Sequence, residues 1–122
     1  MEFNQYNTTV QQWIHTVLEN RETNADVVLE CCRDIIAYGR ETDDPKLMGF
    51  GFFYGGEIYY ELNDGAHFFH MMTEALTYLD RAEEWELVVR CYNFLGIASM
   101  SRGNPSLALD YYMNGLKESD RY

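Results

Sequence analysis

The chain has 122 residues, which suits one domain able to bury a core of its own. Aromatic residues make up 16% of it, which excludes a disordered chain, since disordered chains are poor in aromatics. The 20 acidic and 9 basic residues give a net charge of -11, a field that repels nucleic-acid phosphates and anionic lipids. We therefore expect no nucleic-acid and no membrane partner, and a basic partner if the partner is charged. Alternatively, the acidity only keeps the protein in solution.

The N-terminal residues are polar and lack the basic and apolar regions of a signal peptide. No apolar run reaches the roughly 18 residues of a membrane-spanning helix. The three cysteines are Cys31, Cys32 and Cys91, an odd number that includes an adjacent pair. This pattern indicates reduced thiols and a cytoplasmic location, with Cys32 expected to serve as a small packing residue in a helix. A strained disulfide between Cys31 and Cys32 is the alternative.

Apolar residues recur at helical spacing in six segments. In chain order the predicted helices cover about 5–21, 25–39, 45–62, 66–81, 84–101 and 105–118. Pro45 follows two aspartates, and Gly103-Asn104-Pro105 combines a helix stop with a helix start. The third segment contains Gly49–Gly56, whose glycines and aromatics would also suit a strand. The repeat described next favours a helix there.

The segments repeat every 40 residues. The turn residues Asn24, Asp64 and Asn104 are 40 apart, and each can cap the helix that follows. The apolar residues Cys32, Met72 and Tyr112 share one register, as do Ile36, Leu76 and Leu116. These coincidences predict three helical hairpins over 5–39, 45–81 and 84–118, in a single domain spanning 1–122.

The third hairpin resembles a tetratricopeptide repeat, through Tyr92–Gly96, Gly103, Ala108 and Tyr112. The second hairpin is similar more loosely, and the first, with Thr16 at the position of Gly56 and Gly96, resembles the family least. The resemblance implies an all-α, right-handed solenoid of antiparallel hairpins. The family repeat is shorter, and we expect the extra residues between hairpins, as at Arg40–Asp44. The chain also resembles the N-terminal helical-repeat regions of some bacterial diguanylate cyclases, a fold-level analogy with little functional weight.

In that family the first helix of each hairpin lines a concave binding face. By register, the residues that the resemblance places there are Val10, Trp13, Val17, Asn20, Phe50, Phe53, Glu57, Tyr60, Glu61, Arg90, Asn93, Ile97 and Met100. This set is aromatic and mildly acidic, and it lacks the basic and asparagine clamp with which some members hold a terminal carboxylate. We therefore expect an apolar or basic helix or extended segment as the ligand. The alternative is that several of these aromatics belong to the core.

No motif in the sequence predicts catalysis. His67 and His70 share a helical face, but zinc would need two further ligands at suitable spacing. The acidic residues near 80–86 lie at a helix junction, where they favour the following N-terminus. We expect no catalytic residue, no metal and no cofactor.

The last predicted helix lacks a polar capping face, which stacked repeats need at each end. Leu109, Tyr111 and Met113 fall off the face that carries Ala108, Tyr112 and Leu116, and we expect them at an open surface. Either the chain is the N-terminal part of a longer protein, or this end is buried in a homodimer.

Three functional hypotheses follow. The first is a non-catalytic module that binds a protein or peptide through the concave face. Burial of Phe53, Tyr60 and Asn93 together would disprove it. The second is a regulatory input segment of a larger bacterial signalling enzyme. The third is a self-associating structural module.

Overall fold

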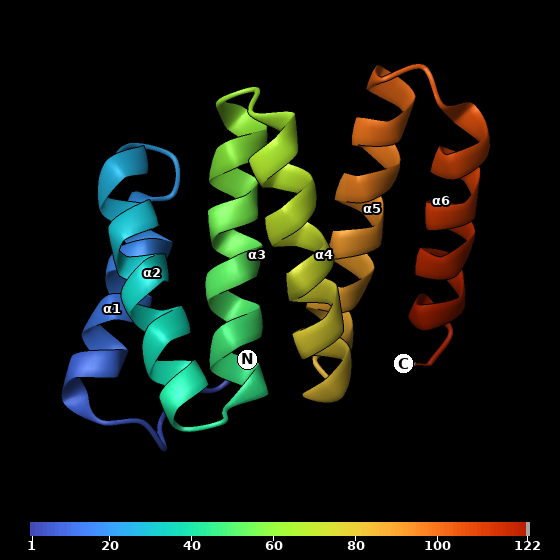
Figure 1. Cartoon of the computed structure of the whole chain (residues 1–122). Helices are drawn as coiled ribbons and strands as arrows, with labels where there is room; N and C mark the ends of the chain where they lie inside the picture. The colour runs from blue at the N-terminus through green and yellow to red at the C-terminus, as the bar shows by residue number, and fades with distance from the viewer. Residues whose placement is uncertain (122) are drawn as a thin grey trace.

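The computed structural model describes residues 1–121 and is all-helical over that range. Its helices are α1 (Thr8–Asn20), α2 (Ala25–Glu41), α3 (Pro45–Glu61), α4 (Gly65–Arg81), α5 (Trp85–Ser101) and α6 (Pro105–Ser119). Consecutive helices run antiparallel and pack side by side in a row from α1 to α6 (Figure 1). This confirms an all-α helical repeat arrangement. In the described residues, no helix combines the length and apolarity needed to cross a membrane.

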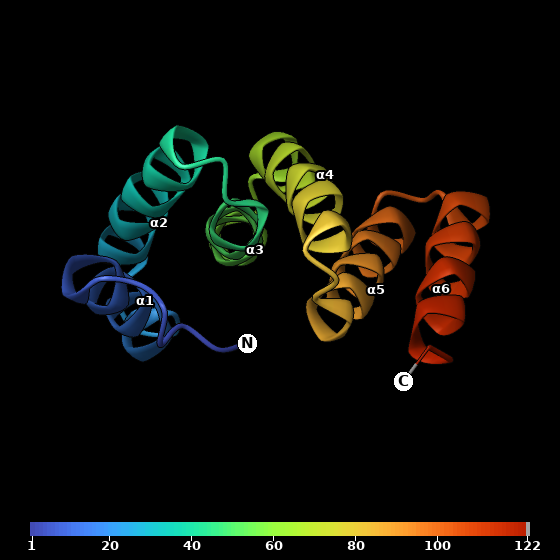
Figure 2. The same cartoon turned by 90° about the horizontal axis from the view of Figure 1, so that it is seen from below.

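The first helix begins three residues later than predicted, because the N-terminal segment makes tertiary contacts instead. Asn7 caps α1 by accepting a hydrogen bond from the Val10 N–H at 2.9 Å. Before this cap, the Tyr6 hydroxyl donates to Asp44 Oδ2 at 2.8 Å, and the Phe3 ring meets Phe50 edge-on at 5.2 Å. The segment thus lies on the inner side of α3, between α1 and α5 (Figure 2).

The predicted capping residues do cap helices. The side chains of Asn24, Asp44, Asp64 and Asn104 each accept a hydrogen bond from the backbone N–H three residues on, at 3.1–3.3 Å. The fifth helix differs, since its N-cap Glu84 makes no such bond.

The last four links between helices are alike, and each has three residues. Asp43, Asn63, Glu83 and Gly103 all have positive φ, between 51° and 77°, and lie 20 residues apart. In each link the next N–H reaches back to a carbonyl five residues earlier, for example from Asp44 N to Gly39 O at 2.8 Å. Among these four links, those within hairpins and those between hairpins therefore have the same length. The expectation that the extra residues lie between hairpins is wrong, because α2 to α5 are each 17 residues long and absorb them.

The third helix is the centre of the fold, and all residues from Leu47 to Ile58 are buried. The stretch Gly49–Gly56 is helical, as the repeat predicts. Its glycines allow close packing on two sides: Gly51 faces α2, and Gly49 and Gly56 face α4. Gly55 lies between the two, closest to Met71 of α4. Small residues let neighbouring helices approach, and the packing offsets the roughly 1 kcal/mol that each helical glycine costs.

Candidate functional site

Two aromatic residues expected on the concave face lie in the core instead. Phe50 is 1% exposed and Phe53 is 0% exposed. The Phe94 ring and the Arg90 guanidinium cover Phe53, at 6.0 and 4.8 Å, and Phe3 covers Phe50. The expectation that they line an accessible surface is wrong, because the middle hairpin is packed on both sides. Val10 and Val17 are buried as well, while Trp13 and Asn20 are half-buried.

Glu57 is also unavailable to a ligand, because arginines from both neighbouring hairpins occupy its oxygens. Arg21 donates to Glu57 in two bonds, from Nε to Oε1 at 2.8 Å and from Nη2 to Oε2 at 2.7 Å. Arg90 Nη2 adds a third contact at 3.4 Å. The two guanidinium groups also lie over aromatic rings, Arg21 over Tyr54 and Arg90 over Phe53. This cluster joins the three hairpins at one point, and the hydrogen bond to Glu57 raises the pKa of Arg21.

The remaining predicted inner-face residues stay accessible. Tyr60 is half-buried, and Glu61 and Asn93 are exposed. Ile97 and Met100 are 43% and 54% exposed, high values for apolar side chains. Of the three residues whose joint burial would disprove the binding hypothesis, only Phe53 is buried. The most accessible part of the predicted face thus lies at the C-terminal end of α3 and on α5.

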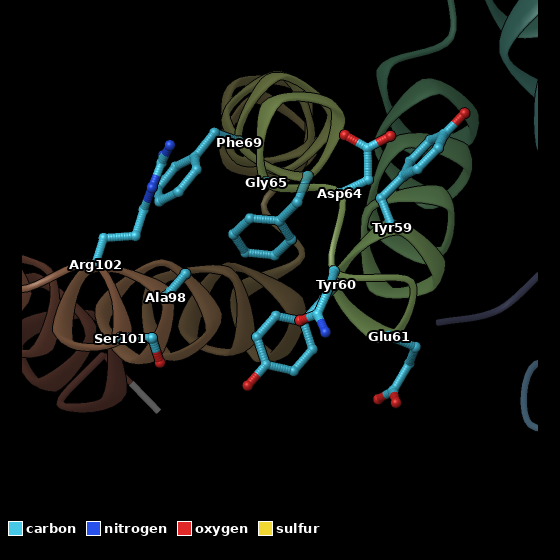
Figure 3. A pocket seen from close by; sticks show the side chains of 11 residues that line it. Tyr59, Tyr60, Glu61, Asp64, Gly65, Phe69, Ala98, Ser101 and Arg102 are labelled. Carbon is cyan, nitrogen blue, oxygen red and sulfur yellow. The ribbon is translucent and has the colours of Figure 1, made fainter.

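A groove lies where this accessible part meets the turn between α3 and α4. We call it the second groove, because an equivalent first groove lies one repeat earlier in the chain. It has a volume of about 500 Å³ and runs between that turn and the C-terminal half of α5. Figure 3 shows Arg102 and Phe69 on one side of the cavity and Tyr60 and Glu61 on the other. The residues lining it are Tyr59, Tyr60, Glu61, Asn63, Asp64, Gly65, Phe68, Phe69, Ala98, Ser101 and Arg102.

Aromatic rings form the apolar part of the second groove. Phe68 is 1% exposed, and the Tyr60 ring packs 5.5 Å from it and 5.4 Å from Phe94. The Arg102 guanidinium lies 4.9 Å from the centre of the Phe69 ring. Two carboxylates, Glu61 and Asp64, border the groove, and the backbone N–H and imidazole of His67 lower the pKa of Asp64. The groove therefore offers an aromatic surface beside two acids and one base.

One repeat earlier, an equivalent cavity of about 520 Å³ separates the first two hairpins. We call it the first groove. Its residues Asn24, Ile58 and Leu62 become Asp64, Ala98 and Arg102 after adding 40. The first groove contains the Arg21–Glu57 ion pair and no aromatic lining residue. Of these two equivalent grooves, only the second is therefore lined by aromatic residues, and the repeat register alone does not reveal this difference.

The last helix has an open apolar face, but its residues differ in part from those predicted. Leu109 and Met113 are exposed as expected, at 58% and 51%. Tyr111 is half-buried and packs against the core, whereas Leu116 is 66% exposed. Placing Tyr111 on the open face and Leu116 on the packed face was wrong. The reason is that α6 contacts α5 through Ala108 and Gly115. The two helices are so close there that a Cβ added to Gly115 would lie 3.1 Å from Tyr92 Cβ.

The two histidines of α4, His67 and His70, each contact neighbouring side chains. His67 Nδ1 lies 2.8 Å from Asp64 Oδ2, and its ring stacks on Tyr59 at 4.8 Å. His70 meets Phe52 edge-on at 6.4 Å. Within residues 1–121, no group of three or more histidine, cysteine or acidic side chains is placed to hold a metal ion.

The three cysteines are free thiols with different surroundings. Cys32 and Cys91 are 1% and 0% exposed, and burial raises the pKa of both thiols far above the usual range. Cys31 is partly exposed, and burial raises the pKa of its thiol as well. The prediction that Cys32 packs in the core is confirmed.

We expect N-ethylmaleimide to modify one thiol per folded chain, at Cys31, and all three thiols in urea. The reason is that Cys32 and Cys91 react only when the helices separate. Mass spectrometry before and after unfolding measures the number of adducts. The variant Cys31→Ser is the control and should gain no adduct while folded. Rapid double modification of the folded protein would contradict the packing of Cys32 or Cys91.

Comparison of the chain with protein-family models, curated proteins and solved structures gives no match. The resemblance to the tetratricopeptide repeat therefore rests on the residues quoted above and stays a prediction.

Proposed function

We propose that this chain is a non-catalytic module that binds a peptide segment of another protein in the second groove. The observation that carries this proposal is the difference between the two equivalent grooves. An internal ion pair occupies the first, whereas the second is a cavity of about 500 Å³ where Tyr60 and Phe69 are accessible and Phe68 is buried. A concave site with aromatic walls and a few polar groups is the usual form of a binding pocket.

The residues around the second groove indicate the ligand's chemistry. An apolar side chain of the peptide would enter against Tyr60 and Phe69, because aromatic walls favour apolar anchors. Glu61 would attract a lysine or arginine beside that anchor, and the net charge of -11 favours a basic partner. Asp64 contributes less, because both of its oxygens already contact His67. Arg102 already lies over Phe69, so it is less available to an acidic ligand. We therefore propose a peptide with an apolar anchor next to basic residues.

The test uses peptides selected from a random library against the wild-type protein. Ser101 is exposed and lines the second groove, so the variant Ser101→Trp should fill the cavity and leave the fold intact. We expect it to weaken the selected peptides by about tenfold or more, measured by fluorescence anisotropy. The charge reversal Glu61→Arg should weaken basic peptides most, by a similar factor.

The matched control is Gln12→Trp, an exposed position on α1 that does not line the groove. It should leave the affinity unchanged, and circular dichroism should show the same helicity in all variants. If the selected peptides bind Ser101→Trp as tightly as the wild type, the second groove is not the binding site and the proposal fails.

A further inference from the structure

An apolar stripe runs along the outer face of α6. We define the α6 stripe as Leu109, Tyr112, Met113 and Leu116, whose spacing of 0, 3, 4 and 7 residues places them on one helical face. Their exposed fractions are 58%, 38%, 51% and 66%. Four large apolar side chains exposed together on one helix mark an interaction surface. This surface is separate from the second groove, which no stripe residue lines.

The equivalent positions in the other hairpins show which stripe residue a further stacked hairpin would leave uncovered. One and two repeats before Met113 lie Thr73 and Arg33, which are polar and exposed although another hairpin follows each of them. At the other three stripe positions the earlier hairpins also carry apolar residues, and all of them pack in or against the core: Leu29, Cys32, Ile36, Phe69, Met72 and Leu76. A further hairpin stacked in the same way would therefore cover most of the stripe but leave Met113 in solvent. A helix packed along α6 would cover Met113 together with the other three stripe residues, and so accounts for the whole stripe.

We infer that this partner is a second copy of the chain, with the two α6 helices packed antiparallel about a twofold axis. The stripe is symmetric about its midpoint between Tyr112 and Met113. In an antiparallel pair, Leu109 therefore faces Leu116 of the second copy, and Tyr112 faces Met113. Each of these contacts occurs twice, as in any twofold interface.

Charges beside the stripe fit the same arrangement. Asp110 and Lys117 are seven residues apart and border one edge of the stripe. An antiparallel pair brings Asp110 of one copy near Lys117 of the other, twice per dimer. In a parallel pair the edge that carries both charges would face the opposite edge of the partner, so Asp110 and Lys117 would not meet. The nearby Glu118 and Arg121 already pair with each other at 3.3 Å.

The net charge of -11 does not prevent this association. Residues 105–121 carry three acidic and two basic side chains, so this end of the molecule is close to neutral. Repulsion from the distant acids is screened over about 8 Å at physiological salt. The interface is small, since one helix of 15 residues is about 22 Å long. We therefore expect a dissociation constant on the order of micromolar, typical of modest interfaces.

Sedimentation velocity from about 1 to about 200 μM tests the inference, because this range spans a micromolar dissociation constant. The wild type should shift from monomer to dimer, and Leu116→Glu should remain monomeric. Leu18→Glu is the matched control, since Leu18 is exposed to 42% on α1, and it should dimerise like the wild type. A wild type that stays monomeric overturns the inference. That result would instead favour packing of the α6 stripe against a helix of another protein. A dimer unaffected by Leu116→Glu overturns it as well.

A charge exchange tests the antiparallel arrangement. Asp110→Lys and Lys117→Asp should each weaken the dimer by about tenfold, because each creates like-charge contacts across the interface. The double variant restores opposite charges and should recover the wild-type constant within about threefold. Failure of the double variant to recover would overturn the antiparallel pairing. Ser101→Trp should leave dimerisation unchanged, which separates this result from the peptide-binding proposal.

Discussion

Replacing Phe53 with alanine is expected to lower the free energy of unfolding by about 3–5 kcal/mol, the usual loss for a buried phenylalanine. Phe53 is 0% exposed, and its ring contacts Tyr54, Phe94 and the Arg90 guanidinium. The substitution would leave a cavity between the second and third hairpins. Domains of this size have a total stability of about 5–15 kcal/mol, so the variant should be only marginally folded. Urea unfolding followed by circular dichroism measures the change.

The matched control for Phe53→Ala is Met100→Ala. Both residues were predicted for the same inner face, but Met100 is 54% exposed. Its substitution should change stability by less than about 0.5 kcal/mol, as at most surface positions. A similar loss in both variants would contradict the different burial of Phe53 and Met100.

Replacing Gly51 with leucine is expected to cost more than about 4 kcal/mol and to prevent stable packing of α3 against α2. A Cβ at Gly51 would lie 2.6 Å from Ile36 Cγ1 and 3.1 Å from the Cys32 carbonyl oxygen. Because that oxygen belongs to the backbone of α2, the conflict can be relieved only by separating the helices. Gly51→Ala should also destabilise, by about 1–3 kcal/mol. Thermal unfolding, together with helicity at low temperature, measures both variants.

Gly56→Ala is the control for a helical glycine that has more room. A Cβ there would lie 3.0 Å from Met72 Cε, the end of a flexible side chain. Alanine also gains about 1 kcal/mol of helix propensity over glycine. We therefore expect Gly56→Ala to be neutral or slightly stabilising. Equal losses in Gly51→Ala and Gly56→Ala would show that close contact with α2 does not decide the cost.

Local signals in the sequence were enough to predict the helices. Asn24, Asp64 and Asn104 cap helices because a short polar side chain satisfies a free N–H within three residues. The predicted ends of the last five helices agree with the structure to within two residues. The first helix differs because Phe3 and Tyr6 contact Phe50 and Asp44, more than 35 residues away. No local pattern encodes such a contact.

The candidate site was predicted only in part. Tyr60 and Glu61 were expected on a binding face and do line the second groove, but Phe69 and Arg102 were missed. They come from α4 and from the link after α5, whereas the resemblance points only to the first helix of each hairpin. Likewise, Arg21 was missed as a partner of Glu57, since the two residues are 36 positions apart. On α6, Leu109 and Met113 were expected at the open surface and are exposed, whereas Leu116 was expected on the packed face and is exposed as well.

The sequence by itself determined the number of helices, their approximate ends and the 40-residue repeat, because helical periodicity and capping depend on residues within one or two turns. Only the tertiary structure decided which apolar residues are buried. Phe53 and Asn93 occupy the same register position, yet Phe53 is enclosed and Asn93 is exposed. The difference arises because Phe94 and Arg90 of the third hairpin cover Phe53, whereas no described helix follows α6 to cover Asn93. Burial in stacked hairpins depends on the neighbour that packs against each face, and that neighbour is distant in sequence.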